Sequence, residues 1–86
     1  QNYPNPFNPE TAIHFDLPVT TAVELTLHNI AGQRVATLAH GHREAGEYTL
    51  RWDGRDDDGK KLASGVYLYR LQAGSRVETR KLLLLR

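Results

Sequence analysis

Apolar and polar residues alternate along almost all of this chain of 86 residues, and turn-forming residues interrupt the alternation about every 8–12 positions. Alternation with period two gives a strand one apolar and one polar face, because successive side chains point to opposite sides. No window shows the repeat of an amphipathic helix. The pattern predicts an all-β fold, an immunoglobulin-like antiparallel β-sandwich of about six to seven strands. The chain has no cysteine, so this sandwich would contain no disulfide.

The strands can be assigned from their apolar faces. The expected inward residues are Ile13, Phe15 and Leu17 in Thr11 to Leu17; Val23, Leu25 and Leu27 in Ala22 to Asn29; Val35 and Leu38 after the turn at Ala31-Gly32; Tyr48, Leu50 and Trp52; and Tyr67, Tyr69 and Leu71 in Val66 to Leu71. Intervening residues such as Thr26 are expected to face outward. The last strand starts at Arg76, and its tail from Leu82 to Leu85 is apolar at every position. That tail predicts a strand covered on both faces.

Three X-Pro bonds near the start predict a stiff, extended lead-in at residues 1–10, ahead of a sandwich at residues 11–86. Each proline fixes φ and removes an amide donor, and it pushes the preceding residue toward extended conformations. Tyr3 and Phe7 are the side chains able to fasten this segment to a core. Because the chain starts inside such a linker, we expect it to be one domain of a longer protein, with any export signal upstream.

A set of short motifs lies at both ends and in the middle of the chain. The motifs are Tyr3-Pro4-Asn5-Pro6-Phe7-Asn8-Pro9 with Thr11 and Ile13; Asn29-Ile30-Ala31-Gly32-Gln33-Arg34-Val35 with Leu38; Gly46 with Trp52-Asp53-Gly54; Gly59; Ala63-Ser64-Gly65-Val66-Tyr67 with Tyr69-Arg70-Leu71; and Thr79-Arg80-Lys81-Leu82-Leu83-Leu84-Leu85-Arg86. Together they resemble the type A C-terminal sorting domains of the type IX secretion system. The middle motifs alone are also similar to the Ig-like domain of flagellar hook-capping proteins.

The resemblance implies a non-catalytic sorting signal that directs an upstream cargo domain across the outer membrane. The cargo would pass through the periplasm and end at the cell surface or outside the cell. The implied partners are the outer-membrane secretion translocon and a sortase-like processing machinery. The candidate recognition residues are Lys81, Leu82, Leu83, Leu84, Leu85 and Arg86. The residues that resemble the structural motif are Pro4, Pro6, Phe7, Pro9, Gly32, Gly46, Trp52, Asp53, Gly54, Gly59, Gly65 and Tyr67.

Other functions remain open at this point. If the terminal leucines form an exposed edge, they could pair with a partner's strand or support a dimer through the last strand. One alternative is a structural assembly domain of the hook-capping type. Another is an accessory carbohydrate-binding sandwich of a secreted glycosidase. A sugar platform needs coplanar exposed aromatic rings, whereas the alternation places the strand aromatics on inward faces.

Metal sites are not favoured by the spacing of the polar clusters. Asp56 and Asp58 could offer oxygen ligands to calcium, but EF-hand spacing would put glycines at the first and twelfth ligand positions, so a solvated hairpin tip is expected. His40 and His42 would aim at one metal if they lay on a strand. Gly41 between them instead favours a surface loop. His14 and His28 fall on outward faces and could be neighbours across strands.

Composition also weighs against several function classes. Ser64 and Ser75 each lie beside glycine as turn serines do, outside any nucleophile elbow, so neither an enzyme nor a cofactor is expected. The formal charge of +1, from 11 basic and 10 acidic residues, suggests no nucleic-acid partner. No apolar run approaches the roughly 18 residues that indicate a transmembrane segment.

Overall fold

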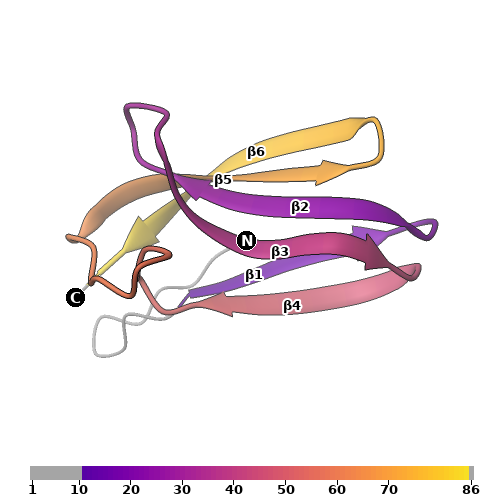
Figure 1. Ribbon diagram of the computed structural model, residues 1–86, viewed down its shortest axis with the longest axis horizontal. Coiled ribbons are helices and arrows are strands. Elements are labelled where there is room, and N and C mark those ends of the chain that lie inside the picture. Colours follow the sequence, from indigo (N-terminus) through magenta and orange to yellow (C-terminus); the bar gives the residue numbers. More distant parts are fainter. Residues whose placement is uncertain (1–10, 86) are drawn as a thin grey trace.

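The computed structural model describes residues 11–85, which form six strands and no helix. The strands are β1 (Thr11–Leu17), β2 (Thr21–His28), β3 (Arg34–Arg43), β4 (Gly46–Trp52), β5 (Gly65–Ala73) and β6 (Arg76–Leu84). β1 and β4 form a two-stranded sheet, and the other four form a sheet in the order β3-β2-β5-β6 (Figure 1). All pairings are antiparallel, as expected for an Ig-like sandwich. The expectations for the lead-in at residues 1–10 and for Arg86 lie outside the described residues.

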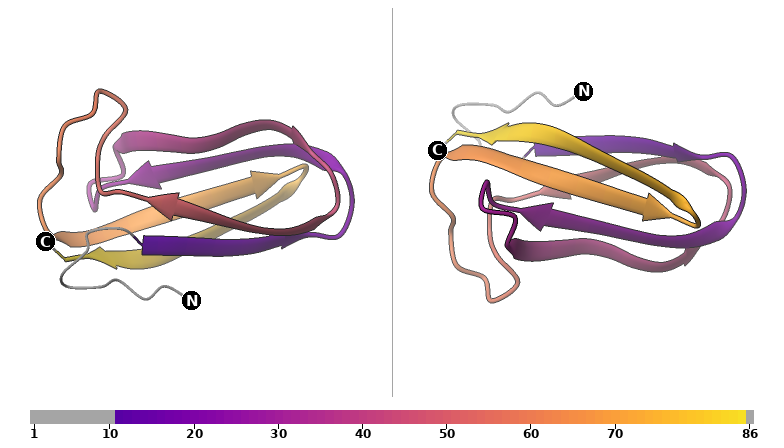
Figure 2. Two further views of the ribbon diagram at one scale, coloured as in Figure 1. Left: turned by 90° about the horizontal axis from the view of Figure 1, so that it is seen from below. Right: turned by 90° about the horizontal axis from the view of Figure 1, so that it is seen from above.

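The two sheets pack face to face, with β1 and β4 lying over one side of the larger sheet (Figure 2). Their facing side chains form the core, which contains Ile13, Leu17, Val23, Leu25, Leu27, Ala36, Ala39, Trp52, Tyr67, Tyr69, Leu71, Leu82 and Leu84. Most of the inward residues that the alternation predicted are therefore buried. Phe15, Tyr48 and Leu50 are partly buried and pack against this core.

The apolar face of β3 differs from the prediction. Val35 and Leu38 have no partner on β2, because the β2–β3 register shifts once at each of them. Each shift is a β-bulge, in which an extra residue interrupts the ladder and changes which side chains point inward. As a result Ala36 and Ala39 are buried, while Val35 and Leu38 are only half-buried.

Two further differences follow from where a strand lies in its sheet. Thr26 is buried although it was expected to face solvent, because β2 lies between two strands and Thr26 has Thr37 and Arg70 as cross-strand neighbours. Leu83 is 42% exposed although the leucine run predicted full cover. β6 is an edge strand, and the two-stranded sheet covers only the inner face of the larger sheet.

The predicted histidine loop is also wrong. His40, Gly41 and His42 all lie in β3, where they pair with Glu24, Val23 and Ala22. Pairing with β2 continues to Arg43, so the turn into β4 comes only after the histidines. His14 and His28 are not cross-strand neighbours, because β1 and β2 belong to different sheets. The described residues include no helix long and apolar enough to cross a membrane.

Candidate recognition strand

The end of β6 carries the candidate recognition residues Lys81 to Leu84, and Leu85 follows the strand and is half-buried. Leu82 and Leu84 point into the core and are 3% and 0% exposed, so they hold the strand onto the sandwich. Leu83 points outward and pairs with Val66 of β5, which is 44% exposed. Lys81 is exposed on the same outward face. Leu83 of the edge strand β6 and Val66 of β5 therefore form a small apolar pair at the surface.

The first half of β6 has a different character, which the sequence reasoning did not identify. Counting back from Leu82 in steps of two places Arg80, Glu78 and Arg76 on the inward side. Glu78 forms ion pairs with Arg76 and Arg80, each at 3.5 Å. Arg76 Nη2 also donates to the carbonyl of Asp16 on β1, at 3.1 Å. Inward-facing charges of this kind discourage pairing at an edge, so only the apolar end of β6 is suited to a partner.

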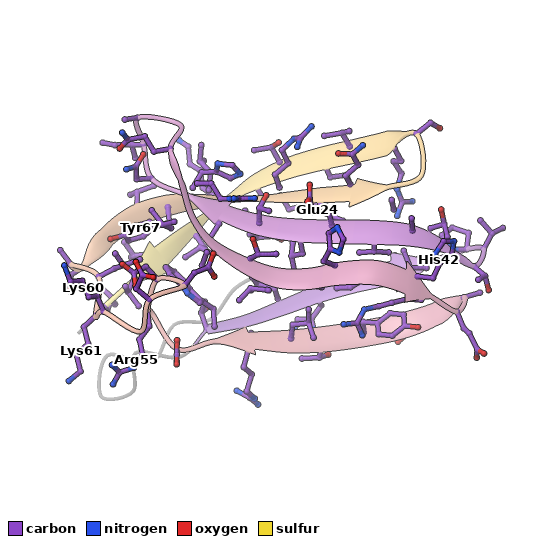
Figure 3. All side chains as sticks on the ribbon, in the orientation of Figure 1. Glu24, His42, Arg55, Lys60, Lys61 and Tyr67 are labelled. Carbon is purple, nitrogen blue, oxygen red and sulfur yellow. The ribbon has the colours of Figure 1, made fainter. Side chains whose placement is uncertain are left out.

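The opposite edge of the same sheet is closed by the loop at residues 53–64. The amide of Asp57 donates to the carbonyl of Val35 at 3.1 Å, and Asp57 Oδ1 accepts from the amide of Thr37 at 3.0 Å. Both partners lie on β3, whose outer side has no other strand. Figure 3 shows Arg55, Lys60 and Lys61 gathered on this loop, at the end of the molecule where Tyr67 lies.

The Trp52-Asp53-Gly54 motif supports that loop. Trp52 is 1% exposed, and its ring meets the ring of Tyr67 edge-on at 5.3 Å. Its Nε1 donates to the carbonyl of Arg55 at 2.9 Å, and the amide of Arg55 donates to Asp53 Oδ1 at 3.1 Å. The hydroxyl of Tyr67 donates to the carbonyl of Ala63 at 2.7 Å, at the far end of the loop. These motif residues thus join the core to the loop.

The other motif glycines belong to turns and strand starts. Gly46 and Gly65 are the first residues of β4 and β5. Gly32 and Gly59 both have φ of 85°, a conformation that favours glycine.

The acidic cluster forms the same turn as the hairpin between β2 and β3. In both turns, a side-chain oxygen of the first residue accepts hydrogen bonds from the backbone amides two and four positions later. Asn29 Oδ1 accepts from Ala31 and Gln33, both at 3.0 Å. Asp56 Oδ1 accepts from Asp58 at 3.0 Å and from Lys60 at 2.9 Å. In both, the amide of the glycine three positions on donates to the first residue's carbonyl. The aspartates therefore form the expected hairpin tip, and Asp56 Oδ1 is directed at amide hydrogens. As the side chains stand in residues 11–85, no three His, Asp or Glu residues converge on one metal position.

The aromatic residues of the described chain do not form a sugar platform. Phe15 and Tyr48 stack at 5.3 Å across β1 and β4, where both pack against the core. Trp52, Tyr67 and Tyr69 are buried. None of the large exposed hydrophobic residues among residues 11–85 is aromatic.

Comparison with known families agrees with this architecture. The model of the FlgD Ig-like domain matches residues 5–76. The chain belongs to the FlgD Ig-like domain family. The family match ends at Arg76, the first residue of β6, so it leaves the apolar end of that strand outside. No curated protein sequence matches the chain.

Three solved structures resemble this FlgD-type Ig-like domain. FlgD from P. aeruginosa is 25% identical with a TM-score of 0.68, over 86% of this chain and 58% of that one. Dimeric latent PorU from Porphyromonas gingivalis is 16% identical with a TM-score of 0.71, over all of this chain and 9% of that one. PorZ from the same organism, described as an essential bacterial surface component of the type-IX secretion system, is 20% identical with a TM-score of 0.61, over all of this chain and 11% of that one. The chain thus spans between 9% and 58% of these proteins.

Proposed function

We propose that this Ig-like domain is a non-catalytic sorting signal of the type IX secretion system. The observation that carries the proposal is the end of β6, where Leu83 of this edge strand and its cross-strand neighbour Val66 of β5 form an exposed apolar pair. A strand edge with an apolar contact beside it is suited to recognition by strand addition, in which main-chain hydrogen bonds give affinity and side-chain pockets give specificity. The occupant that we propose is a subunit of the outer-membrane translocon.

Two further features support this function. The segment after Arg76, which resembles the close of the sorting domains, lies outside the FlgD family match at residues 5–76. The structures of PorU and PorZ match the whole chain in fold, although their identity of 16% and 20% supports the fold alone. On this proposal the domain is exported with an upstream cargo, passes through the periplasm, and is recognised by the translocon and a sortase-like processing machinery.

The role that we propose is non-catalytic because of the polar side chains that are buried. Within residues 11–85 the buried polar side chains are Thr11 and Thr26, so no buried carboxyl or imidazole is available. General acid and base catalysis normally uses such a group, because burial shifts its pKa toward the working pH. The proposed role therefore depends on recognition of a folded surface.

The test is export of a reporter fused in front of the chain, behind a signal peptide, in a bacterium with an intact type IX system and in a translocon-deficient strain. Leu83→Lys places a charge in the exposed apolar pair. Val19→Lys is the control, because it introduces the same charge at a valine that is 65% exposed between β1 and β2. We expect surface delivery for the unaltered chain and for Val19→Lys, and loss of delivery for Leu83→Lys. Removal of Leu82 to Arg86 should also abolish delivery. Equal delivery of both lysine variants would contradict a role for β6.

A structural assembly domain is the second candidate, because the family match and the 25% identity to P. aeruginosa FlgD both favour it. In that case the exposed pair on β6 would pack within a larger assembly or against a second copy of the domain. The folded reporter fusion would then remain in the periplasm in every strain. Sedimentation of the purified chain would show association that Leu83→Lys removes.

A further inference from the structure

The His40-Gly41-His42 segment has a geometry that its sequence did not predict. Both histidines lie on the outward face of β3, and both are exposed. Glu24 of the neighbouring strand β2 pairs with His40, and Ala22 pairs with His42. Figure 3 shows Glu24 and His42 extending from these two neighbouring strands. Three groups that can bind a metal through nitrogen or oxygen therefore share one surface.

The spacing suits convergence on a single ion. Two residues on a strand rise by about 6.6 Å, and two imidazoles at that separation can each reach about 2.0–2.1 Å from one metal. The Cβ atoms of a cross-strand pair lie about 4.5–5.5 Å apart, which places the Glu24 carboxylate beside the His40 ring. Ala22 is small, so the surface beside His42 is an open hollow of about 400 Å³ that includes Glu24, His40, Gly41 and His42.

The other histidines of the chain differ from this pair. His14 Nδ1 is hydrogen-bonded to Thr49 Oγ1 at 2.8 Å, and His28 Nε2 to Thr26 Oγ1 at 2.9 Å. Neither the His40 imidazole nor the His42 imidazole has a hydrogen bond or ion pair with any residue between 11 and 85. A metal ion would therefore replace only water at these two rings and would displace no hydrogen bond of the folded domain.

We propose that His40 and His42, assisted by Glu24, form a surface site for a divalent transition-metal ion such as Zn²⁺, Ni²⁺ or Cu²⁺. Imidazole ligands favour these ions, whereas Mg²⁺ and Ca²⁺ prefer all-oxygen sites. In the structure the three side chains do not converge on a single metal position. Exposed side chains change rotamer within nanoseconds, so their rotation can complete the site. Water would supply the remaining ligands.

Calorimetric titration of the untagged chain with ZnCl₂ and NiCl₂, in a buffer that does not bind metals, tests the proposal. We expect saturable binding of one ion per chain in the micromolar range, and none with MgCl₂ or CaCl₂. His40→Gln or His42→Gln should weaken binding by more than about tenfold, because each removes one of two nitrogen ligands. Glu24→Gln should weaken it less. His14→Gln is the matched control and should bind as the unaltered chain does.

A spectroscopic measurement identifies the location independently. Substoichiometric Cu²⁺ should broaden the amide NMR signals of Glu24, His40 and His42 before those of His14 and His28. Absence of saturable binding, binding that survives the double variant His40→Gln/His42→Gln, or broadening centred on another part of the chain would each overturn the proposal. Because the Glu24, His40 and His42 variants change only β2 and β3, an unchanged NMR spectrum of these variants elsewhere in the chain serves as the control for folding.

Discussion

The two edges of the four-stranded sheet are constructed in opposite ways. β3 carries two bulges in its pairing with β2. On its outer side, Asp57 forms hydrogen bonds with the backbone groups of Val35 and Thr37. β6 pairs with β5 through nine consecutive residue pairs without a register shift. Bulges and covering loops are common means of preventing a sheet edge from pairing with another chain, whereas a regular edge remains a template for it. The difference indicates that the sandwich is closed on the β3 side and suited to a partner on the β6 side.

The difference extends to the side chains. The buried residues of β3 are alanines, and its larger apolar residues Val35 and Leu38 are at the bulges. In β6 the inward charged residues Arg76, Glu78 and Arg80 precede the leucines Leu82 to Leu84, which form its end. The regular part of β6 that lacks inward charge is therefore the part that contains Leu83, the residue on which the proposed function depends.

Replacement of Trp52 with alanine should have the largest effect, because it empties the core beneath the loop that closes the β3 edge. We expect a loss of about 3–5 kcal/mol in the free energy of unfolding, as for other large aromatic truncations. Urea unfolding followed by circular dichroism measures it. Trp52→Phe keeps an aromatic ring beside Tyr67 but loses the hydrogen bond to the Arg55 carbonyl, so it should cost less. Native stability of the alanine variant would refute the role of Trp52 in the core.

Two adjacent leucines of β6 should behave very differently. Leu84→Ala should lower the free energy of unfolding by about 2–5 kcal/mol, because Leu84 is fully buried. Leu83→Ala should change it by less than about 0.5 kcal/mol, because that side chain is largely outside the core. Urea unfolding of both variants under the same conditions gives the comparison. Similar losses for the two would mean that the end of β6 is covered on both faces, as the leucine run alone suggested.

Asp57→Ala should weaken the closure of the β3 edge by a smaller amount. The variant removes the acceptor of the Thr37 amide but keeps the backbone bond to Val35, so we expect a cost of about 1 kcal/mol. Hydrogen exchange at the Thr37 amide should become faster. Asp58→Ala is the matched control, because the Asp58 side chain makes no bond to the described residues. Equal exchange rates in both variants would show that Asp57 does not close the edge.

The sequence predicted the strands well, because alternation and turn residues are local signals. It did not predict the bulges, since shifting the inward positions of β3 from Val35 and Leu38 to Ala36 and Ala39 also leaves an apolar face. The burial of a residue such as Thr26 depends on having a strand on each side, which is decided by pairing between distant segments. Single-strand patterns do not contain that information.

The candidate sites show the same limit. The sequence placed the recognition residues on the last strand, but the exposure of Leu83 beside Val66 follows from β6 being an edge. Alternation extended backward from Leu82 could have revealed the inward charges at Arg80, Glu78 and Arg76. The strand position of His40 and His42 could not be predicted from local sequence, because Gly41 is compatible with a loop and its place in β3 depends on pairing with β2.

The smallest effect should come from Asp56→Asn, which tests whether the acidic turn and the Asn29 turn are equivalent. The amide oxygen of asparagine can accept the same two backbone hydrogen bonds, as Asn29 does, so stability should change by less than about 0.5 kcal/mol. Asp56→Ala removes the acceptor and should cost about 1 kcal/mol. Thermal unfolding with and without CaCl₂ provides the measurement. A calcium-dependent rise in melting temperature that Asp56→Asn abolishes would show that the carboxylate has a role beyond the turn. Equal melting temperatures of the unaltered chain and the Asp56→Asn variant, with and without CaCl₂, would mean that Asp56 acts only as the hydrogen-bond acceptor of this turn, which is part of the loop that closes the β3 edge.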